Sequence, residues 1–134
     1  MKQIIRILVF IAAFLAPLSM SAQNDGNDVF TPISKYIKQG NVDYLSSWFD
    51  DNLEVAIIDN TSNSSRNQAK QITKAFFESH TPRSFEITHK VDKHGMKYAL
   101  GTLNAGGETY IVTIFVKFKG KDYKIQMLKI ENLE

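Results

Sequence analysis

The C-terminal half of the chain alternates apolar and polar residues with a period of two, and no other feature constrains the fold as strongly. Three short turn sequences interrupt the alternation: DKHG, NAGGE and KGKD. A period of two is typical of strands, and breaks of this length that contain glycine are typical of hairpin turns. The sequence therefore predicts four consecutive strands in an antiparallel meander, near residues 85–92, 96–104, 109–118 and 122–131.

The residues before the meander begin with two short helices. Thr31 and Gly40 bracket the first helix, which has a proline in its first turn and a glycine as its stop. A second helix is expected from Asn41, because the next apolar residues recur at helical spacing: Val42, Leu45, Trp48 and Phe49. The segment 52–58 is rich in β-branched residues and predicts a short strand.

A loop and a third helix complete the order of elements. The polar stretch DNTSNSSRN, at residues 59–67, is expected to be a loop by its composition. Ser65 with Gln68 three residues later forms a capping box for a helix that ends before Pro82 and buries Ala69, Ile72 and Phe76. The resulting fold class is α+β, a curved antiparallel sheet of one short strand plus a four-strand meander, with three helices on one face.

The strand expected at 109–118 is apolar on both faces. One face carries Tyr110, Val112, Ile114, Val116 and Phe118, and the other carries Ile111, Thr113 and Phe115. Three helices can cover only one face of the sheet, whereas a strand with two apolar faces needs cover on both. The pattern therefore predicts a partner on the face that the helices leave open.

The N-terminus has the three parts of a secretory signal peptide. Lys2 and Arg6 precede an apolar run, which is followed by a proline and by small residues up to Ala22. The run is shorter than the roughly 20 apolar residues that a membrane-spanning helix needs. We expect a signal peptide at 1–22, a flexible leader at 23–28 and a single domain at 29–134, exported to the periplasm or secreted.

Cysteine count and charge narrow the function further. The chain has no cysteine, which excludes a disulfide framework and a lipid-anchored lipoprotein. Loss of Lys2 and Arg6 with the signal leaves 14 basic against 14 acidic residues. Acidic residues are concentrated before residue 62 and basic residues after it, a dipolar arrangement that favours self-association over a polyanionic partner.

The three histidines do not predict a metal site. His89 and His94 are five residues apart, about 16 Å along an extended strand, and His80 at a helix end is explained by the helix dipole. No metal-binding spacing such as H-E-x-x-H occurs. His89 falls in step with Phe85 and Ile87, so it is either a hydrogen-bonded core residue or a residue that lines a cavity between sheet and helices.

Several other chemistries have little support in the sequence. There is no G-x-S-x-G elbow for a nucleophilic serine, and the glycine pair in NAGGE lacks the context of a phosphate-binding loop. The lysine-rich stretch VKFKGKDYK could contact nucleic acid, but lysines at a hairpin tip also keep a sheet soluble and discourage edge pairing. We therefore expect no cofactor, no nucleic-acid partner and no membrane span.

The stretches GNVDYLSSWFDDNLEV and SRNQAKQITKAFF, followed by the meander, resemble the nuclear transport factor 2-like superfamily. This is the cone-shaped α+β fold of ketosteroid isomerases, limonene epoxide hydrolases and small exported bacterial families without an assigned reaction. The resemblance covers residues 29–131 and implies a homodimer formed through the outer sheet surface. Its motifs specify fold more than activity.

The residues that would carry isomerase chemistry in this superfamily are absent. Alignment on the resemblance places the catalytic base at Ile57, the second acid near Thr113 and the helix tyrosine near Ile33. An apolar side chain cannot accept a proton, so steroid isomerase chemistry is improbable. The hydrolase's Asp-Arg-Asp arrangement has no evident counterpart either.

The resemblance instead predicts a ligand-binding cone. Its inner wall would include Tyr36, Trp48, His89 and Thr113, which combine apolar surface with a few hydrogen-bonding groups. The leading hypothesis is a non-enzymatic homodimer that binds a small apolar or amphipathic ligand, or another protein. The alternative is a small-molecule enzyme that uses His89 as general base, assisted by Asp59 or a tyrosine.

Overall fold

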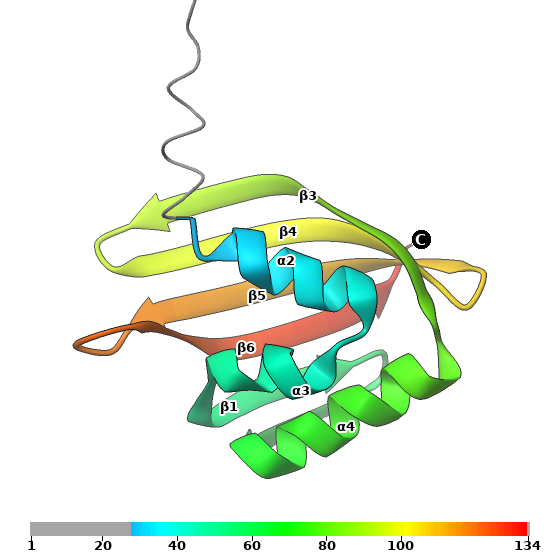
Figure 1. Cartoon of the computed structure of the whole chain (residues 1–134), viewed down its shortest axis with the longest axis horizontal. Coiled ribbons are helices and arrows are strands. Elements are labelled where there is room, and N and C mark those ends of the chain that lie inside the picture. Colours follow the sequence, from blue (N-terminus) through cyan, green and yellow to red (C-terminus); the bar gives the residue numbers. More distant parts are fainter. Residues whose placement is uncertain (1–27, 134) are drawn as a thin grey trace, which may run out of the picture. The chain divides into compact units, whose positions relative to one another are not determined.

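The computed structural model describes residues 28–133, and the residues from Pro32 onward form one compact unit. The predicted signal peptide at 1–22 and nearly all of the predicted leader lie outside the described residues. Figure 1 shows the elements in chain order: helix α2 (Phe30–Gln39), helix α3 (Val42–Leu45), the 3-10 turn η1 (Ser46–Trp48), strand β1 (Phe49–Ile57), strand β2 (Asn60–Ser65), helix α4 (Arg66–Ser79), and strands β3 (Pro82–Lys93), β4 (Met96–Ala105), β5 (Glu108–Phe118) and β6 (Tyr123–Asn132).

All six strands belong to one curled, open sheet in the order β2-β1-β6-β5-β4-β3. The predicted meander is confirmed, because β3, β4, β5 and β6 pair with their sequence neighbours in antiparallel fashion. Strand β1 runs parallel to β6, which makes the sheet mixed rather than wholly antiparallel. The helices lie on one side of the sheet (Figure 1), so the predicted α+β class with three helices on a curved sheet is confirmed.

The expected loop at 59–67 was wrong over most of its length, because residues 60–65 form strand β2. Tight turning at Ile58, which has a φ of 57°, brings this segment back along β1 as an antiparallel hairpin. The side chains of β2 are exposed except for that of Ser64. An edge strand of this kind is stabilised by backbone pairing rather than by apolar side chains, so composition alone did not reveal it.

The second predicted helix is much shorter than expected. Helix α3 ends at Leu45, and the Ser46 and Ser47 hydroxyls each donate to a backbone carbonyl three residues earlier, which tightens the chain into η1. Phe49 then begins β1 and is fully buried beside Ile125. Trp48 and Phe49 therefore leave the helix, although their spacing fits one.

Helix α4 begins as predicted. The Ser65 hydroxyl accepts a hydrogen bond of 3.2 Å from the Gln68 amide, which is the N-cap half of a capping box. Ala69 and Phe76 are buried as expected, but Thr73 takes the buried position that Ile72 was expected to fill. The Thr73 hydroxyl is satisfied in the core because it donates to the Ala69 carbonyl at 2.8 Å.

The core lies between the helices and the inner face of the sheet. Val112, Ile114 and Val116 of β5 are fully buried, as are Ile33 and Ile37 of α2. Burying an aliphatic side chain of this size contributes about 1.5–3 kcal/mol each. The inner face is therefore the part of the sheet that the hydrophobic effect fixes most strongly.

Candidate functional site

A bulge in β3 decides where His89 lies. Ile87 pairs with Gly101 and His89 pairs with Leu100, so Thr88 is an extra residue without a pairing position. The bulge shifts the alternation by one residue and turns the His89 side chain to the opposite face from Phe85 and Ile87. The expectation that His89 shares their face was therefore wrong, and the structure places it, exposed, on the outer face of the sheet.

The other predicted ligand-binding residues are divided between two sides of the sheet. Thr113 is buried but lies on the outer face, in the same cross-strand row as Leu100 and His89. Tyr36 is half-buried on α2, where its ring meets Tyr44 edge-on at 5.5 Å. The structure therefore does not gather the predicted set in one cavity.

Trp48 lines a cleft at one end of the sheet. The cleft has a volume of about 260 Å³ and is lined by Ser47, Trp48, Asp122, Tyr123 and Lys124. The Lys124 ammonium donates to the Ser47 carbonyl at 3.2 Å and so holds η1 against β6. The cleft combines two aromatic rings with one cation and one carboxylate, that of Asp122.

The outer face of the sheet carries a group of apolar side chains, which we call the outer patch, with His89, Thr113 and Lys129 in the row of Leu100. Register places its members in neighbouring cross-strand positions: Val91, Met96, Tyr98, Leu100, Ile111, Phe115 and Met127. The exposed fractions of Val91, Met96 and Tyr98 are 42%, 41% and 44%, although the three side chains are apolar or aromatic. Exposed apolar surface of this kind is typical of interaction sites.

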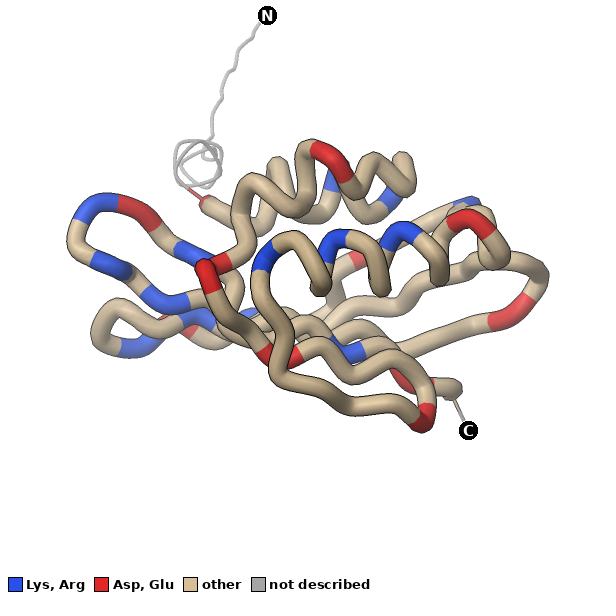
Figure 2. The backbone as a smooth tube through the Cα atoms, turned by 90° about the horizontal axis from the view of Figure 1, so that it is seen from below, with Lys and Arg blue, Asp and Glu red and all other residues tan. Residues whose placement is uncertain are grey.

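Charged rows border the outer patch at both ends. One row joins Glu86 and Glu131 through Thr102 and Ile111, and the other joins Lys93 and Lys117 through Met96. Figure 2 shows the lysine side gathered at two hairpin tips. An apolar centre with a charged rim is the usual anatomy of a protein–protein interface.

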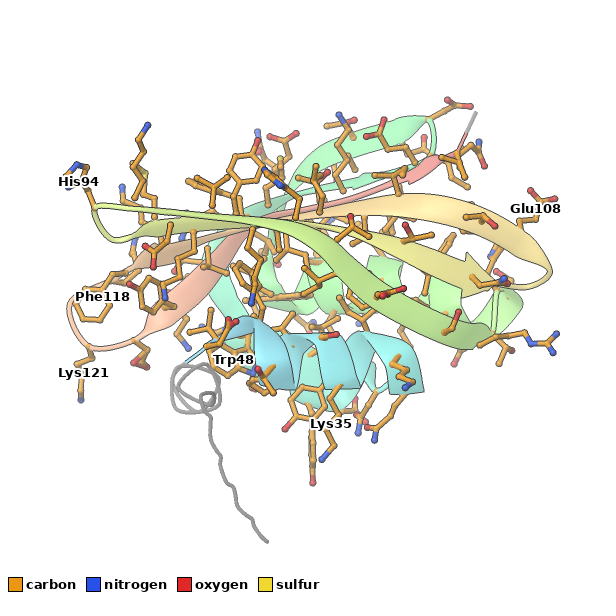
Figure 3. All side chains as sticks on the ribbon, turned by 90° about the horizontal axis from the view of Figure 1, so that it is seen from above. Lys35, Trp48, His94, Glu108, Phe118 and Lys121 are labelled. Carbon is orange, nitrogen blue, oxygen red and sulfur yellow. The ribbon has the colours of Figure 1, made fainter. Side chains whose placement is uncertain are left out.

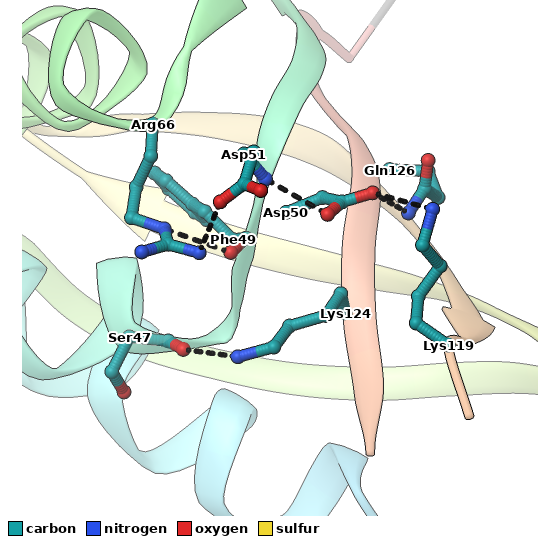
Figure 4. A network of polar contacts seen from close by, with 8 residues as sticks. All are labelled: Ser47, Phe49, Asp50, Asp51, Arg66, Lys119, Lys124 and Gln126. Carbon is teal, nitrogen blue, oxygen red and sulfur yellow. Dashed lines mark hydrogen bonds and ion pairs between the residues drawn. The ribbon is translucent and has the colours of Figure 1, made fainter. Parts of the chain in front are cut away.

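A polar network ties the start of β1 to β6 and to α4 (Figure 4). The Asp50 carboxylate accepts from the Gln126 side-chain amide at 2.6 Å and from the Asp51 backbone amide at 2.8 Å, and lies 3.3 Å from the Lys119 ammonium. Arg66 donates to the Phe49 carbonyl at 3.1 Å and to Asp51 at 3.0 Å. These contacts surround the break in register between β1 and β6.

Asp50 remains ionised in this network. Burial raises the pKa of its carboxyl, but hydrogen bonds from Gln126, the Asp51 amide and Lys119 outweigh burial and hold the pKa below the ordinary 3.8. A carboxylate that is charged and fully hydrogen-bonded is suited to a structural role rather than to proton transfer. No pattern in the sequence marks this site, because two of its partners, Gln126 and Lys119, are far from Asp50 along the chain.

Comparison with known families decides where the chain belongs. The model of the domain of unknown function DUF4783 matches residues 30–131. The chain belongs to this family. A search of the curated proteins finds no match.

Solved DUF4783 structures share the fold of this chain at low sequence identity. A Bacteroides uniformis protein superposes with a TM-score of 0.76 at 20% identity, covering 80% of this chain and 99% of its own. A Bacteroides fragilis protein gives 0.74 at 21% identity, covering 79% and 100%. A protein of the NTF2-like family from Streptomyces avermitilis gives 0.62 at 11% identity, covering 84% and 99%. The predicted nuclear transport factor 2-like fold is thus confirmed, and identity this low shows the fold alone.

The remaining geometry of this DUF4783 domain offers little to catalysis by His89. Within the described range, no hydrogen bond or ion pair joins the His89 ring to another side chain. Asp59, its predicted assistant, lies in the turn between β1 and β2, whereas His89 is on β3 at the opposite edge of the sheet. A general base needs an orienting partner within hydrogen-bond reach.

Two further findings concern the part of the chain that the structure describes. No group of three or more potential metal ligands gathers among residues 28–133. None of the helices in this range has the length and apolar character needed to cross a lipid bilayer.

Proposed function

We propose that the chain is an exported, non-enzymatic binding protein that works as a homodimer, with the outer patch as the contact between the two copies. The observation that carries the proposal is the exposure of Val91, Met96 and Tyr98 on a sheet face that none of the described helices covers. Removing apolar area from water is favourable by about 25 cal/mol per Å². A partner that covers this surface therefore forms a complex that the hydrophobic effect stabilises. Export is proposed from the signal-like N-terminus.

Charge favours a second copy as the occupant of the outer patch. A two-fold axis that lies in the contact plane and across the strands would place the row of Glu86 and Glu131 opposite the partner's row of Lys93 and Lys117. Glu131 already lies 3.7 Å from Lys129 in the same chain, so Glu86 is the freer acid. The patch is therefore self-complementary in sign as well as in hydrophobicity.

The ligand-binding part of the proposal concerns the helix side of the sheet. Of the four residues that the sequence suggested, His89 and Thr113 lie on the outer face, so only Tyr36 and Trp48 remain available to a small apolar or amphipathic ligand. The cleft beside Trp48 is below the roughly 300–1,000 Å³ of typical ligand pockets. A small ligand or another protein would therefore meet an open surface here.

Sedimentation equilibrium of the chain from Gln23 onward tests the homodimer. Tyr98→Lys should weaken dimerisation at least tenfold, because two unpaired ammonium groups would be buried in each dimer. Tyr44→Lys is the matched control, because Tyr44 is 60% exposed and lies on α3, away from the outer patch. A chain that stays monomeric at all concentrations, or that responds equally to both variants, would refute the proposal.

A charge swap tests the orientation of the two copies. Glu86→Lys should weaken the dimer, and adding Lys93→Glu with Lys117→Glu should restore it. If the triple variant is weaker than Glu86→Lys alone, the acidic and basic rows do not face one another.

A further inference from the structure

The β5–β6 hairpin presents two aromatic rings at one end of the sheet, on the helix side, and Trp48 of η1 lies beside them. Phe118 is 45% exposed, and its ring meets Tyr123 edge-on at a centroid distance of 5.2 Å. Tyr123 in turn shares its cleft with Trp48. Figure 3 shows Phe118, Trp48 and Lys121 at this end. The rings form a stepped apolar surface that runs from the cleft out to the hairpin.

Lysines surround these rings. The segment 117–124 contains four lysines and one aspartate, and the adjacent segment 90–97 contains three lysines and one aspartate. The two hairpin tips touch, because the Phe118 amide donates to the Gly95 carbonyl at 2.8 Å. The Lys97 ammonium lies 5.0 Å from the centroid of the Tyr123 ring. The whole end of the sheet is therefore cationic, although the net charge of the chain is small.

Solubility explains the lysines but not the rings. Lysines at strand ends and hairpin tips discourage edge pairing. An exposed phenylalanine between Lys117 and Lys119, continuous with Tyr123 and Trp48, works against that role because it adds apolar surface at the same tip. The combination needs a partner that is apolar and anionic together.

We propose that this aromatic–lysine surface, formed by Trp48, Phe118, Lys121, Tyr123 and Lys124, docks the protein on a membrane surface rich in anionic lipids. Tryptophan and tyrosine favour the depth of lipid headgroups, and lysines near the surface are attracted to anionic leaflets. No arginine follows Arg83 in the sequence, so the basic residues of both hairpin tips are lysines. A lysine ammonium is a point charge, whereas the planar guanidinium of arginine is suited to binding a single phosphate. Such a surface is suited to an extended anionic membrane surface.

The proposal is independent of the homodimer. Phe118 and Tyr123 form a cross-strand pair next to the pair of Lys117 and Lys124. Because Phe118 follows the inner-facing Val116 by two residues, this aromatic pair also lies on the inner face of the sheet. The outer patch lies on the other face. Covering the outer patch with a second copy leaves the aromatic rings free.

Vesicle co-sedimentation of the chain from Gln23 onward tests the proposal. Starting there excludes the apolar N-terminal run, and relatives solved as this domain alone, matched over 99% or 100% of their length, support its independent folding. We expect binding to vesicles of phosphatidylglycerol and phosphatidylethanolamine that weakens with salt, and none to phosphatidylcholine. Trp48 is the sole tryptophan, so its emission should shift to the blue and be quenched by brominated anionic lipid.

Matched variants give the size of the effect. Lys121→Gln should weaken vesicle binding about fivefold, since each lysine near an anionic surface contributes about that much. Lys35→Gln removes the same charge from α2 and should change binding less than about twofold. Phe118→Ser should weaken binding several-fold at unchanged circular dichroism, because the ring is exposed.

Three results would overturn the proposal. The first is absence of binding to anionic vesicles at low salt. The second is an equal loss of binding in Lys121→Gln and Lys35→Gln, which would indicate that net charge alone drives binding. The third is binding to a soluble polyanion such as heparin without vesicle binding, which would assign the surface to an acidic polymer.

Discussion

The two faces of β5 are alike in composition and differ in cover. Ile114 points toward the helices and is fully buried, whereas its neighbour Phe115 points outward and is only half-buried beside Tyr98. Both positions carry apolar residue types that are common in strands. The difference shows that the helices complete the inner core, whereas no layer among the described residues covers the apolar side chains of the outer face.

The largest effect on the free energy of unfolding should come from truncating a buried side chain of the inner face, and an exposed side chain of the outer face provides the comparison. Ile114→Ala should lower the free energy of unfolding by about 2–5 kcal/mol, because it leaves a cavity under the helices. Tyr98→Ala should lower it by less than about 1 kcal/mol at concentrations where the chain is monomeric, because nearly half of the side chain is already exposed to water. Urea denaturation measures both values. Equal losses would mean that the outer patch is already part of the monomer's core.

Gly101 offers a sharper test of the inner face. A Cβ atom at this position would lie 2.6 Å from two atoms of the Phe85 ring and 2.9 Å from the Glu86 carbonyl oxygen. Gly101→Ala should therefore cost about 1–3 kcal/mol through overpacking. In a Phe85→Leu background the additional loss should be smaller, because part of the clash is removed. Thermal denaturation of wild type, the two single variants and the double variant forms a double-mutant cycle. Strictly additive losses of stability would contradict the contact between position 101 and the Phe85 ring.

The Asp50 network should contribute a smaller and pH-dependent effect. Because the folded pKa of Asp50 lies below the unfolded value near 3.8, its contribution is fully present above that pH and is lost as pH falls through the folded pKa. Asp50→Asn should cost about 1–2 kcal/mol at neutral pH. The difference between wild type and variant should shrink when unfolding is measured below pH ~4. A constant difference would show that the charge does not matter.

The smallest effect is expected at His89. His89→Gln should change the free energy of unfolding by less than about 0.5 kcal/mol, because the side chain is exposed on the outer face. Chemical denaturation measures the change. A loss above about 1.5 kcal/mol would place the ring inside the core, which is where unbroken alternation from Phe85 would have put it.

The fold was predictable because its signals are local and repeated. Alternation on β4 to β6, the turn glycines and the Ser65 cap each report on neighbouring residues, and together they define the meander and α4. Strand β2 escaped prediction because its polar residues pair through the backbone alone. The early start of β1 was not predicted, because the spacing of Trp48 and Phe49 fits the buried side of a helix as well as it fits a turn followed by a strand.

The candidate site was less predictable because it depends on register. One unpaired residue at Thr88 moves His89 to the other face, and no feature of the sequence marked that bulge. Ile111, Thr113 and Phe115 were correctly placed together on one face of their strand, since that strand is regular up to Phe115. The alternation did not say which face the helices cover, and Thr113 was wrongly expected to line the cone. Tyr98 and Val91 join them only through pairing between strands, which a pattern within one strand does not contain.

The most direct test of the central claim, that a second copy covers the outer patch, is the reactivity of a single thiol. The chain has no cysteine, so Val91→Cys places one thiol in the patch with little change in volume, and Tyr44→Cys places one on α3. We predict that the thiol at position 91 reacts with an aromatic disulfide reagent more slowly as protein concentration rises, while the thiol at position 44 reacts at a constant rate. A rate at position 91 that is independent of concentration would contradict the account.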